Sequence, residues 1–330
     1  MTRTPLSRRD ALRLATMGGV VALAGCSATP QRATTQQSAP VARRAWGAFI
    51  PDVLARDGST SNPIERLATL AGSTPHYLHR FVSFGDSLPT AELDAIGAAG
   101  AQPLLTLEPW KPGAGTVQPL FSLARIASGV FDGELRKWAS GLSAWGKPVL
   151  LRFAQEMNGT WYPWSIGVSG NTADQYREAW KRMHTVFTDA GAGNVRFVWA
   201  PNVVTDGTSD FTAAFPGHDL VDYLALDGYN WAGGSGHRWQ WPEELFSASL
   251  ATLARIDSDR PLLITETASA EGDMPSLKAD WIRRLFGIVE ATDRLEGALW
   301  FQMDKERDWR FNSTPQSLDA FRRSVAALSG

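Results

Sequence analysis

The chain of 330 residues has little cysteine, little net charge and few histidines, and each shortage argues against a class of function. A single cysteine, Cys26, leaves no partner for an intramolecular disulfide. The formal net charge of −2 argues against nucleic acid as a partner, because proteins that bind polyanions usually carry a clear basic excess. The apolar run Leu14–Ala24 is too short and too rich in glycine for a comfortable membrane span.

The five histidines give little support for a metal centre. His76 and His79 are the one close pair, and they precede or enter a predicted strand. A spacing of three residues on a strand directs side chains to opposite faces. We therefore expect no metal ion and no cofactor.

Tryptophan, by contrast, is abundant, with 14 tryptophans against 5 tyrosines. Part of this set is expected to fill the core, for which the chain has ample apolar residues. The others stand beside glycine, proline, asparagine and charged residues, a setting typical of loops and so of binding surfaces.

The N-terminal 44 residues are expected to lie outside the folded domain. Paired arginines in Ser7–Arg13 precede the apolar run, as in a twin-arginine export signal. The segment LAGC that ends at Cys26 resembles a bacterial lipobox, in which the cysteine becomes the lipid-bearing first residue. We predict a signal peptide over residues 1–25 and a flexible tether over 26–44. The protein would be exported to the cell envelope, either lipid-anchored at Cys26 or secreted.

Residues 45–330 alternate short apolar runs with longer amphipathic segments, which is the pattern of a parallel sheet with crossover helices. The predicted strands are Trp46–Ile50, Tyr77–Phe84, Pro103–Leu107, Val149–Phe153, Val195–Ala200, Tyr223–Asp227, Leu262–Glu266 and Ala298–Phe301. The predicted helices include Thr172–Ala190, Glu243–Ile256, Ser276–Ala291 and Gln316–Leu328, with a segment near Leu120–Ala144 broken around Gly129 and Gly133. Eight such units in roughly 285 residues predict an α/β fold, a single-domain (β/α)8 barrel of the TIM type.

A doubly wound open sheet is the main alternative fold. It is disfavoured because no glycine-rich phosphate fingerprint follows the first predicted strand. The unusual polar residues also fall at the C-terminal ends of predicted strands, where barrels build their active sites.

Two carboxylates stand at such strand ends. Glu156 lies in RFAQEMNGTWYPW (152–164), directly after a predicted strand, and Glu266 ends the apolar run PLLITE (261–266). Cleavage of a glycosidic bond needs one carboxyl group that donates a proton and a second that stays ionised. The flat faces of tryptophan and tyrosine supply apolar surface for the C–H faces of sugar rings. The pattern therefore predicts a glycosidase.

Strand alternation predicts which side chains share the interior of the barrel. The predicted interior sets are Leu262, Ile264 and Glu266 on one strand, and Arg152, Ala154 and Glu156 on the other. The two glutamates would then project over the barrel mouth from nearly opposite sides.

Four segments occur in order at predicted strand ends. They are EMNGTWYPW (156–164), DGYNW (227–231), TE (265–266), and WF followed by DKERDWR (300–310). They resemble the acid/base motif, the strand-six signature, the nucleophile strand and the strand-eight end of glycoside hydrolase family 26. This is a barrel family of retaining, endo-acting β-glycanases, chiefly β-mannanases. The resemblance extends over most of residues 45–315 and implies a polysaccharide substrate.

The resemblance also implies a role for each matching residue. Glu156 would be the general acid and then the general base, and Glu266 the nucleophile, hydrogen-bonded by Tyr229. Trp300 would form the floor under the sugar that is attacked. The other substrate-binding residues expected in the site are Trp110, Gln155, Trp161, Trp164 and Asn202. For Trp110, ordinary loop packing is an equally open interpretation.

One position departs from the family pattern. Many members carry histidine immediately before the acid/base, where this chain has Gln155. Glutamine donates a hydrogen bond but does not titrate near neutral pH. We expect the mechanism to survive and leave the substrate open among β-1,4-mannan, mixed-linkage β-glucan and β-1,3-xylan.

Two other functions are compatible with these residues. A lipid-anchored glycan-binding protein would keep the aromatic platforms without catalysis, but such proteins are expected to have two lobes and this chain shows no central boundary. A transglycosylase would differ from a hydrolase in water access alone. We expect a monomeric hydrolase that meets the membrane only through Cys26.

Overall fold

The computed structural model describes residues 44–55, 62–233, 236–274 and 276–328. These residues belong to one compact unit, Ala42–Gly330. The predicted signal peptide, the lipobox with Cys26 and nearly all of the predicted tether lie outside the described residues. Within the described ranges, no helix combines the length and the apolar character needed to cross a membrane.

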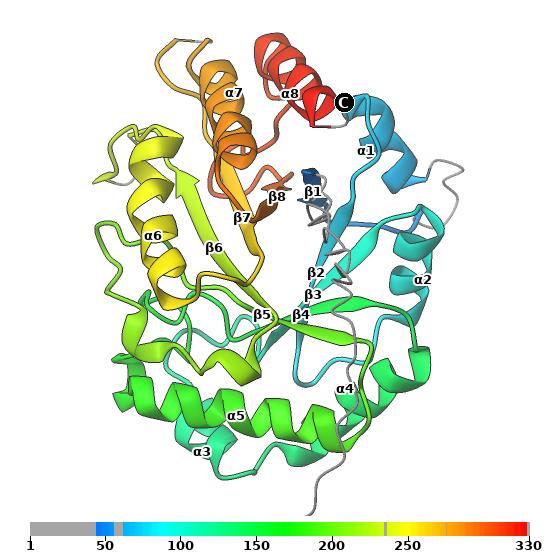
Figure 1. Cartoon of the computed structure of the whole chain (residues 1–330), viewed down its shortest axis with the longest axis vertical. Helices are drawn as coiled ribbons and strands as arrows, with labels where there is room; N and C mark the ends of the chain where they lie inside the picture. The colour runs from blue at the N-terminus through cyan, green and yellow to red at the C-terminus, as the bar shows by residue number, and fades with distance from the viewer. Residues whose placement is uncertain (1–43, 56–61, 234–235, 275, 329–330) are drawn as a thin grey trace, which may run out of the picture. The chain divides into compact units, whose positions relative to one another are not determined.

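Eight parallel strands close into a barrel in sequence order, which confirms the predicted (β/α)8 fold (Figure 1). The strands are β1 Ala45–Phe49, β2 Tyr77–Ser83, β3 Gln102–Glu108, β4 Val149–Phe153, β5 Val195–Trp199, β6 Tyr223–Asn230, β7 Leu262–Ser269 and β8 Leu295–Phe301. All the predicted strands are present. β6 and β7 continue beyond their predicted ends, so Tyr229 lies within a strand rather than after it, and Glu266 lies inside a strand rather than at its end.

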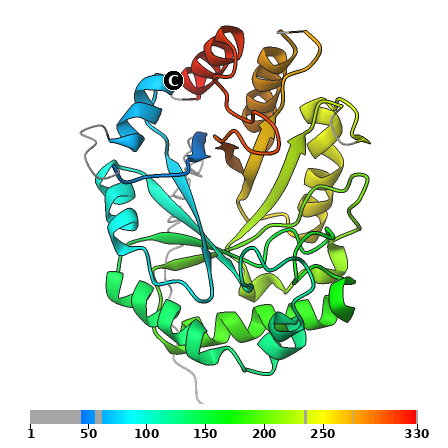
Figure 2. The ribbon, with the colours of Figure 1, turned by 180° about the vertical axis from the view of Figure 1, so that it is seen from behind.

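Helices form the outer layer around the strands, as the two opposite views show (Figures 1 and 2). They are α1 Pro63–Ala71, α2 Thr90–Ala98, α3 Leu123–Ala127, α4 Asp132–Trp145, α5 Ala173–Asp189, α6 Pro242–Ile256, α7 Ser276–Ala291 and α8 Pro315–Ala327. Single 3₁₀ turns occur at Pro119–Phe121, Val168–Gly170, Thr212–Ala214 and His218–Leu220. The predicted break lies between α3 and α4, where Gly129 has a φ of 85°, a conformation that glycine adopts without strain. Gly133 lies inside α4 instead.

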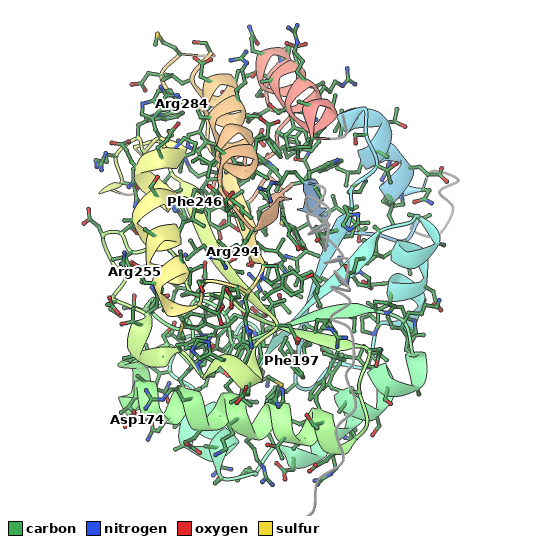
Figure 3. All side chains as sticks on the ribbon, in the orientation of Figure 1. Asp174, Phe197, Phe246, Arg255, Arg284 and Arg294 are labelled. Atoms are coloured by element: carbon green, nitrogen blue, oxygen red, sulfur yellow. The ribbon has the colours of Figure 1, made fainter. Side chains whose placement is uncertain are left out.

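The core has two layers. The side chains inside the barrel are Tyr77, Leu104, Leu150, Val198, Ala200, Ala225, Leu263 and Leu299. A larger cluster fills the space between the strands and the helices. Figure 3 shows how one helix divides its side chains: Phe246 of α6 is buried, whereas Arg255 of the same helix is exposed on the outer surface.

The predicted orientation of two β7 side chains is wrong. Leu263 lies inside the barrel, whereas Leu262 and Ile264 pack in the outer layer against the helices. Alternate residues of a regular strand do face the same side. The predicted set was derived from the position of Glu266 on the assumption that β7 is regular.

A β-bulge in β7 explains this error. Leu226 of β6 pairs with Ile264, but the next residue, Asp227, pairs with Glu266, so β7 carries one extra residue at this point. A bulge changes the direction of the side chains that follow it. The Thr265 hydroxyl donates a hydrogen bond of 2.6 Å to Asp227, while Glu266 also faces the upper interior of the barrel.

Candidate active site

A cavity of about 670 Å³ lies at the C-terminal ends of the strands. Side chains that line it include Phe49, Phe81, Glu108, Trp110, Glu156, Trp161, Tyr162, Asn202, Tyr229, Trp231, Glu266, Phe301 and Trp309. This is the end at which (β/α)8 barrels build their active sites. Both predicted catalytic glutamates, Glu156 and Glu266, line this cavity.

Glu266 is bound by a cation and by a hydroxyl. Its Oε1 forms an ion pair with Arg152 Nη2, and its Oε2 accepts a hydrogen bond of 2.6 Å from the Tyr229 hydroxyl. The predicted contact with Tyr229 is therefore present. Both oxygens have donors, an arrangement that stabilises the ionised carboxylate.

Arg152 connects the strands beneath the cavity. Its fully buried guanidinium forms a second ion pair, of 2.6 Å, with Asp227 of β6 and donates from Nε to Thr106 at 2.8 Å. Burial and the nearby Arg152 charge hold the pKa of His79 well below its usual range. The neutral ring accepts from Arg152 Nη2 at 3.2 Å. Arg152 was not predicted as a site residue, although a charged residue inside an apolar strand requires a buried partner.

Glu156 lies just beyond the end of β4, where the chain leaves the strand geometry. Ala154 and Glu156 have φ values of 46° and 53°, and the Glu156 amide donates to the Ala200 carbonyl at 2.8 Å. Left-handed backbone at residues other than glycine costs about 1–3 kcal/mol each and is concentrated at functional sites. The prediction that Ala154 points inward with Arg152 is wrong, because β4 ends at Phe153 and Ala154 packs in the outer layer.

The Glu156 carboxyl group has only uncharged donors in hydrogen-bonding contact. Trp161 Nε1 donates to Oε2 at 2.7 Å, and Asn202 Nδ2 donates to Oε1 at 2.6 Å. Burial, followed by repulsion from Glu266, raises the pKa of Glu156 to about 7, and the two donors oppose part of this rise. Near neutral pH this group can therefore hold or release a proton.

The residues after Glu156 orient its two donors. Asn158 accepts from the Asn202 amide at 2.8 Å and donates to the Asn202 carbonyl at 2.9 Å. Gly159 allows the Trp161 ring to lie against the backbone, since a Cβ at this position would stand 2.5 Å from the ring. This part of the sequence motif thus serves to hold the carboxyl group of Glu156.

A third carboxyl group, which the sequence analysis missed, belongs to Glu108 at the end of β3. Gln155 Nε2 donates to its Oε1 at 2.8 Å, and Trp110 Nε1 donates to its Oε2 at 3.0 Å. Burial raises the pKa of Glu108 to about 7 against the effect of these donors. The signal was available in the sequence, because Glu108 directly follows a mostly apolar run, PLLTL (103–107), just as Glu266 ends the run PLLITE.

Trp110, Trp161, Asn202 and Tyr229 line the cavity as expected, but Gln155 and Trp164 do not. Both of the latter are fully buried. Trp164 stacks on Tyr162 with ring centroids 4.3 Å apart and donates from Nε1 to the Gln155 carbonyl at 2.6 Å. The structure thus corrects their predicted role, because they support the wall of the cavity from behind.

Trp300 is also not the floor of the cavity. Successive residues on a strand face opposite sides. Phe301 lines the cavity, so Trp300 faces the helices, with Trp281 of α7 and Phe321 of α8 at centroid distances of 5.9 and 5.6 Å. Trp309, from the loop after β8, provides the cavity-facing indole in its place.

The site supplies acid–base chemistry from its own side chains. In the part of the chain that the structure describes, no group of three or more His, Cys, Asp or Glu side chains is arranged to hold a metal ion. Glu266, paired with a cation, and Glu156, which can be protonated, face the same cavity. Such a pair is able to act as nucleophile and proton donor.

Comparison with curated sequences identifies relatives among polysaccharide-degrading enzymes. Endoglucanase H of Acetivibrio thermocellus is 33% identical over 279 residues, which cover 82% of this chain and 29% of that protein. Beta-1,3-xylanase TXYA of a Vibrio species is 21% identical over 293 residues, which cover 80% of this chain and 60% of that protein. The chain thus spans less than two thirds of the length of either relative.

Comparison with solved structures shows the same fold in an enzyme domain. The catalytic domain of the family 26 endo-beta-1,4-mannanase of Bacillus sp. JAMB-750 superposes with a TM-score of 0.68 at 16% identity, covering 87% of this chain and 86% of that domain. The sequence model of glycosyl hydrolase family 26 matches residues 129–275, which include Glu156 and Glu266. This chain belongs to glycosyl hydrolase family 26.

Proposed function

We propose that this chain hydrolyses a β-linked polysaccharide by double displacement, with Glu266 as the nucleophile and Glu156 as the acid/base. One observation carries the proposal: the two carboxyl groups face one cavity, and only Glu266 is ion-paired with Arg152. A carboxylate paired with a cation, beside a carboxyl group that titrates near neutral pH, meets the needs of a retaining glycosidase.

In the first step, Glu266 attacks the anomeric carbon while Glu156 donates its proton to the departing oxygen. The product is a covalent glycosyl-enzyme, in which Glu266 has lost its negative charge. The repulsion that raises the pKa of Glu156 is then removed, so this pKa falls. Glu156, now ionised and stabilised by Trp161 and Asn202, accepts a proton from the water that completes hydrolysis.

The aromatic lining supports a polymer rather than a small polar substrate. The Trp161 ring is 39% exposed, an unusual exposure for so large an apolar group. Trp231, Trp309 and Trp110 present further rings to the same cavity. Their faces suit the C–H faces of successive sugar rings in a chain.

We propose three candidate polymers, each supported by a relative. The mannanase whose catalytic domain shares the fold supports β-1,4-mannan, the endoglucanase supports mixed-linkage β-glucan, and the xylanase supports β-1,3-xylan. Gln155 sets this chain apart from histidine-bearing members, and it donates a hydrogen bond to Glu108, which lines the cavity. This pair is therefore our first candidate for a determinant of sugar preference.

The test is release of reducing ends from the three polymers by purified protein. Wild type is compared with Glu266→Ala and with Glu243→Ala, which removes an exposed carboxylate of α6 as a matched control. We expect release from one polymer, abolished in Glu266→Ala and unchanged in Glu243→Ala. Nuclear magnetic resonance of the first product should show the β-anomer. Normal activity in Glu266→Ala, or an α-anomer as first product, contradicts the proposed mechanism.

We also propose that the protein is exported and attached to the membrane through Cys26. β1 begins at Ala45, at the end of the barrel opposite the cavity. An anchor upstream of Arg44 therefore joins the barrel away from the substrate site. In a fractionated bacterial host, wild type should be found with membranes and Cys26→Ala in the soluble exported fraction. Equal distribution of the two proteins would refute the anchor.

A further inference from the structure

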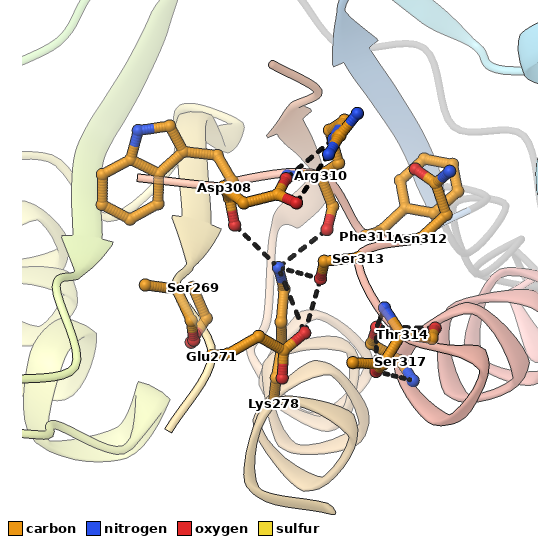
Figure 4. Close-up of polar contacts among 12 residues, drawn as sticks. Ser269, Glu271, Lys278, Asp308, Arg310, Phe311, Asn312, Ser313, Thr314 and Ser317 are labelled. Atoms are coloured by element: carbon orange, nitrogen blue, oxygen red, sulfur yellow. Dashed lines mark hydrogen bonds and ion pairs between the residues drawn. The ribbon is translucent and has the colours of Figure 1, made fainter. Parts of the chain in front are cut away.

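A buried lysine contacts the loop that forms one wall of the cavity. Lys278 of α7 is fully buried, and its ammonium group points into the loop between β8 and α8 (Figure 4). Nζ lies 3.1 Å from the Asp308 carbonyl, 2.7 Å from the Arg310 carbonyl and 2.7 Å from the Ser313 hydroxyl. An ammonium group has three donors, and all three are used here.

The charge of Lys278 is only partly balanced. Glu271 lies 3.8 Å from Nζ and accepts a hydrogen bond from the Ser313 hydroxyl. Burial lowers the pKa of Lys278 to about 8, so the group remains mostly protonated at neutral pH. An apolar side chain of similar volume is often as stabilising as a buried charge. An apolar side chain cannot, however, donate hydrogen bonds to three acceptors at once.

The two carbonyls that Lys278 binds stand on either side of Trp309. The Trp309 carbonyl itself accepts from Trp300 Nε1 at 2.8 Å, and its amide donates to the Met303 carbonyl at 3.0 Å. Three consecutive carbonyls of this loop are thus held by side chains from α7 and β8. This gives the buried Trp300 a second use, since it fixes the backbone of the tryptophan that faces the cavity.

Trp309 in turn contacts the residues around the nucleophile. Its ring centroid lies 5.2 Å from that of Tyr229 and 5.0 Å, edge to face, from that of Trp231. Tyr229 donates the hydrogen bond to Glu266. A displacement of Trp309 would therefore change both the sugar-binding surface and the packing of the hydroxyl group that binds Glu266.

We propose that Lys278 is a positioning residue, which fixes Trp309 against Tyr229 and so shapes the nucleophile side of the cavity for the sugar. The ammonium group touches no substrate. It acts through the loop backbone alone. This inference rests on the proposed glycosidase function for its kinetic test, and on the spectrum of Trp309 for a test without turnover.

The decisive experiment is a double-mutant cycle of Lys278→Met and Trp309→Ala, measured as kcat and KM on the polymer that wild type degrades. We expect Lys278→Met to lower kcat/KM by about 10-fold, mainly through KM, because a misplaced binding group loses sugar contacts. In the Trp309→Ala background the same change should cost less than about 2-fold, since the residue it positions is gone. Equal losses in the two backgrounds would overturn the proposal.

Two further variants separate positioning from stability. Asn194→Ala removes hydrogen bonds of 2.9 and 2.8 Å to the Leu142 and Lys147 carbonyls at the far end of the barrel, so it should lower Tm without changing KM. Ser313→Ala removes one acceptor of Lys278 and should raise KM by about 2- to 3-fold in wild type and not in Trp309→Ala. If Lys278→Met does not fold, this second cycle decides, and a KM equal to that of wild type refutes the proposal.

The near-ultraviolet circular dichroism of the unliganded protein tests the same idea without turnover. The band that disappears in Trp309→Ala should also be weakened in Lys278→Met and retained in Asn194→Ala. If the protein is inactive on all three polymers but shows this pattern, the result contradicts the proposed function and supports the positioning role of Lys278. Retention of the band in Lys278→Met refutes the role whatever the activity.

Discussion

Glu266 and Glu156 face the same cavity, and they are 7% and 6% exposed, so depth of burial does not distinguish them. Their partners do. Glu266 is bound by the Arg152 guanidinium and the Tyr229 hydroxyl, whereas Glu156 accepts from two uncharged side chains, one of which is Trp161. In the second arrangement, burial and repulsion from Glu266 raise the pKa of Glu156 to about 7.

Glu108 is a third buried carboxyl group of the cavity, and its hydrogen-bond donors resemble those of Glu156. It is buried beside the other two, has only the uncharged donors Gln155 and Trp110, and also has a pKa raised to about 7. In this cavity the ion pair with Arg152, rather than depth of burial, distinguishes Glu266, the proposed nucleophile, from Glu156, the proposed acid.

Removing the cation should have the largest effect. Arg152→Met leaves Asp227 and Glu266 buried without their charged partner, so we expect a loss of about 3–5 kcal/mol in the free energy of unfolding. In protein that still folds, kcat/KM should fall about 100- to 1,000-fold, because Glu266, the proposed nucleophile, loses the cation that binds it. Denaturant unfolding and polymer hydrolysis measure the two losses. Arg152→Lys, which keeps a charge, should lose less, and an active Arg152→Met would show that the cation is dispensable.

Replacing the acid should remove one limb of the pH profile. In the proposed mechanism the protonated form of Glu156 is the active one, so kcat/KM in wild type should fall as pH rises through about 7. Glu156→Gln should be about 100-fold less active on polymer and should lack this limb. Glu108→Gln is the necessary control, because Glu108 has a similar pKa. If the limb disappears in Glu108→Gln and persists in Glu156→Gln, then Glu108 rather than Glu156 is the acid.

The fold and the two glutamates were predictable because their signals are local. Apolar alternation and helical periodicity identified every strand, and Glu156 and Glu266 were recognised because each follows an apolar run. Thr314, which accepts from the Ser317 amide at 3.2 Å, caps α8, the helix predicted at Gln316–Leu328. These features depend on residues within one or two turns of the chain.

The errors arose where orientation depends on distant partners. The bulge at Glu266 is defined by the pairing of β7 with β6, so the sequence of β7 alone does not predict it. Trp300 and Phe301 are adjacent, so a prediction of which one faces the cavity depends on a register of one residue. Arg152 lies 114 positions from Glu266 in the chain, and only the closed barrel brings them together.

The smallest expected effect concerns Trp161, an uncharged hydrogen-bond donor to Glu156. Trp161→Phe keeps an aromatic ring and removes the donor to Glu156, whose ionised form loses one hydrogen bond. A bond worth about 1 kcal/mol corresponds to about 0.7 pH units, so the alkaline limb of kcat/KM should move upward by about that amount. Trp231→Phe, which lines the cavity without touching Glu156, should leave the limb in place. A limb that stays fixed in Trp161→Phe would mean that burial and Glu266 set the proton affinity of Glu156 and that the indole serves the sugar alone.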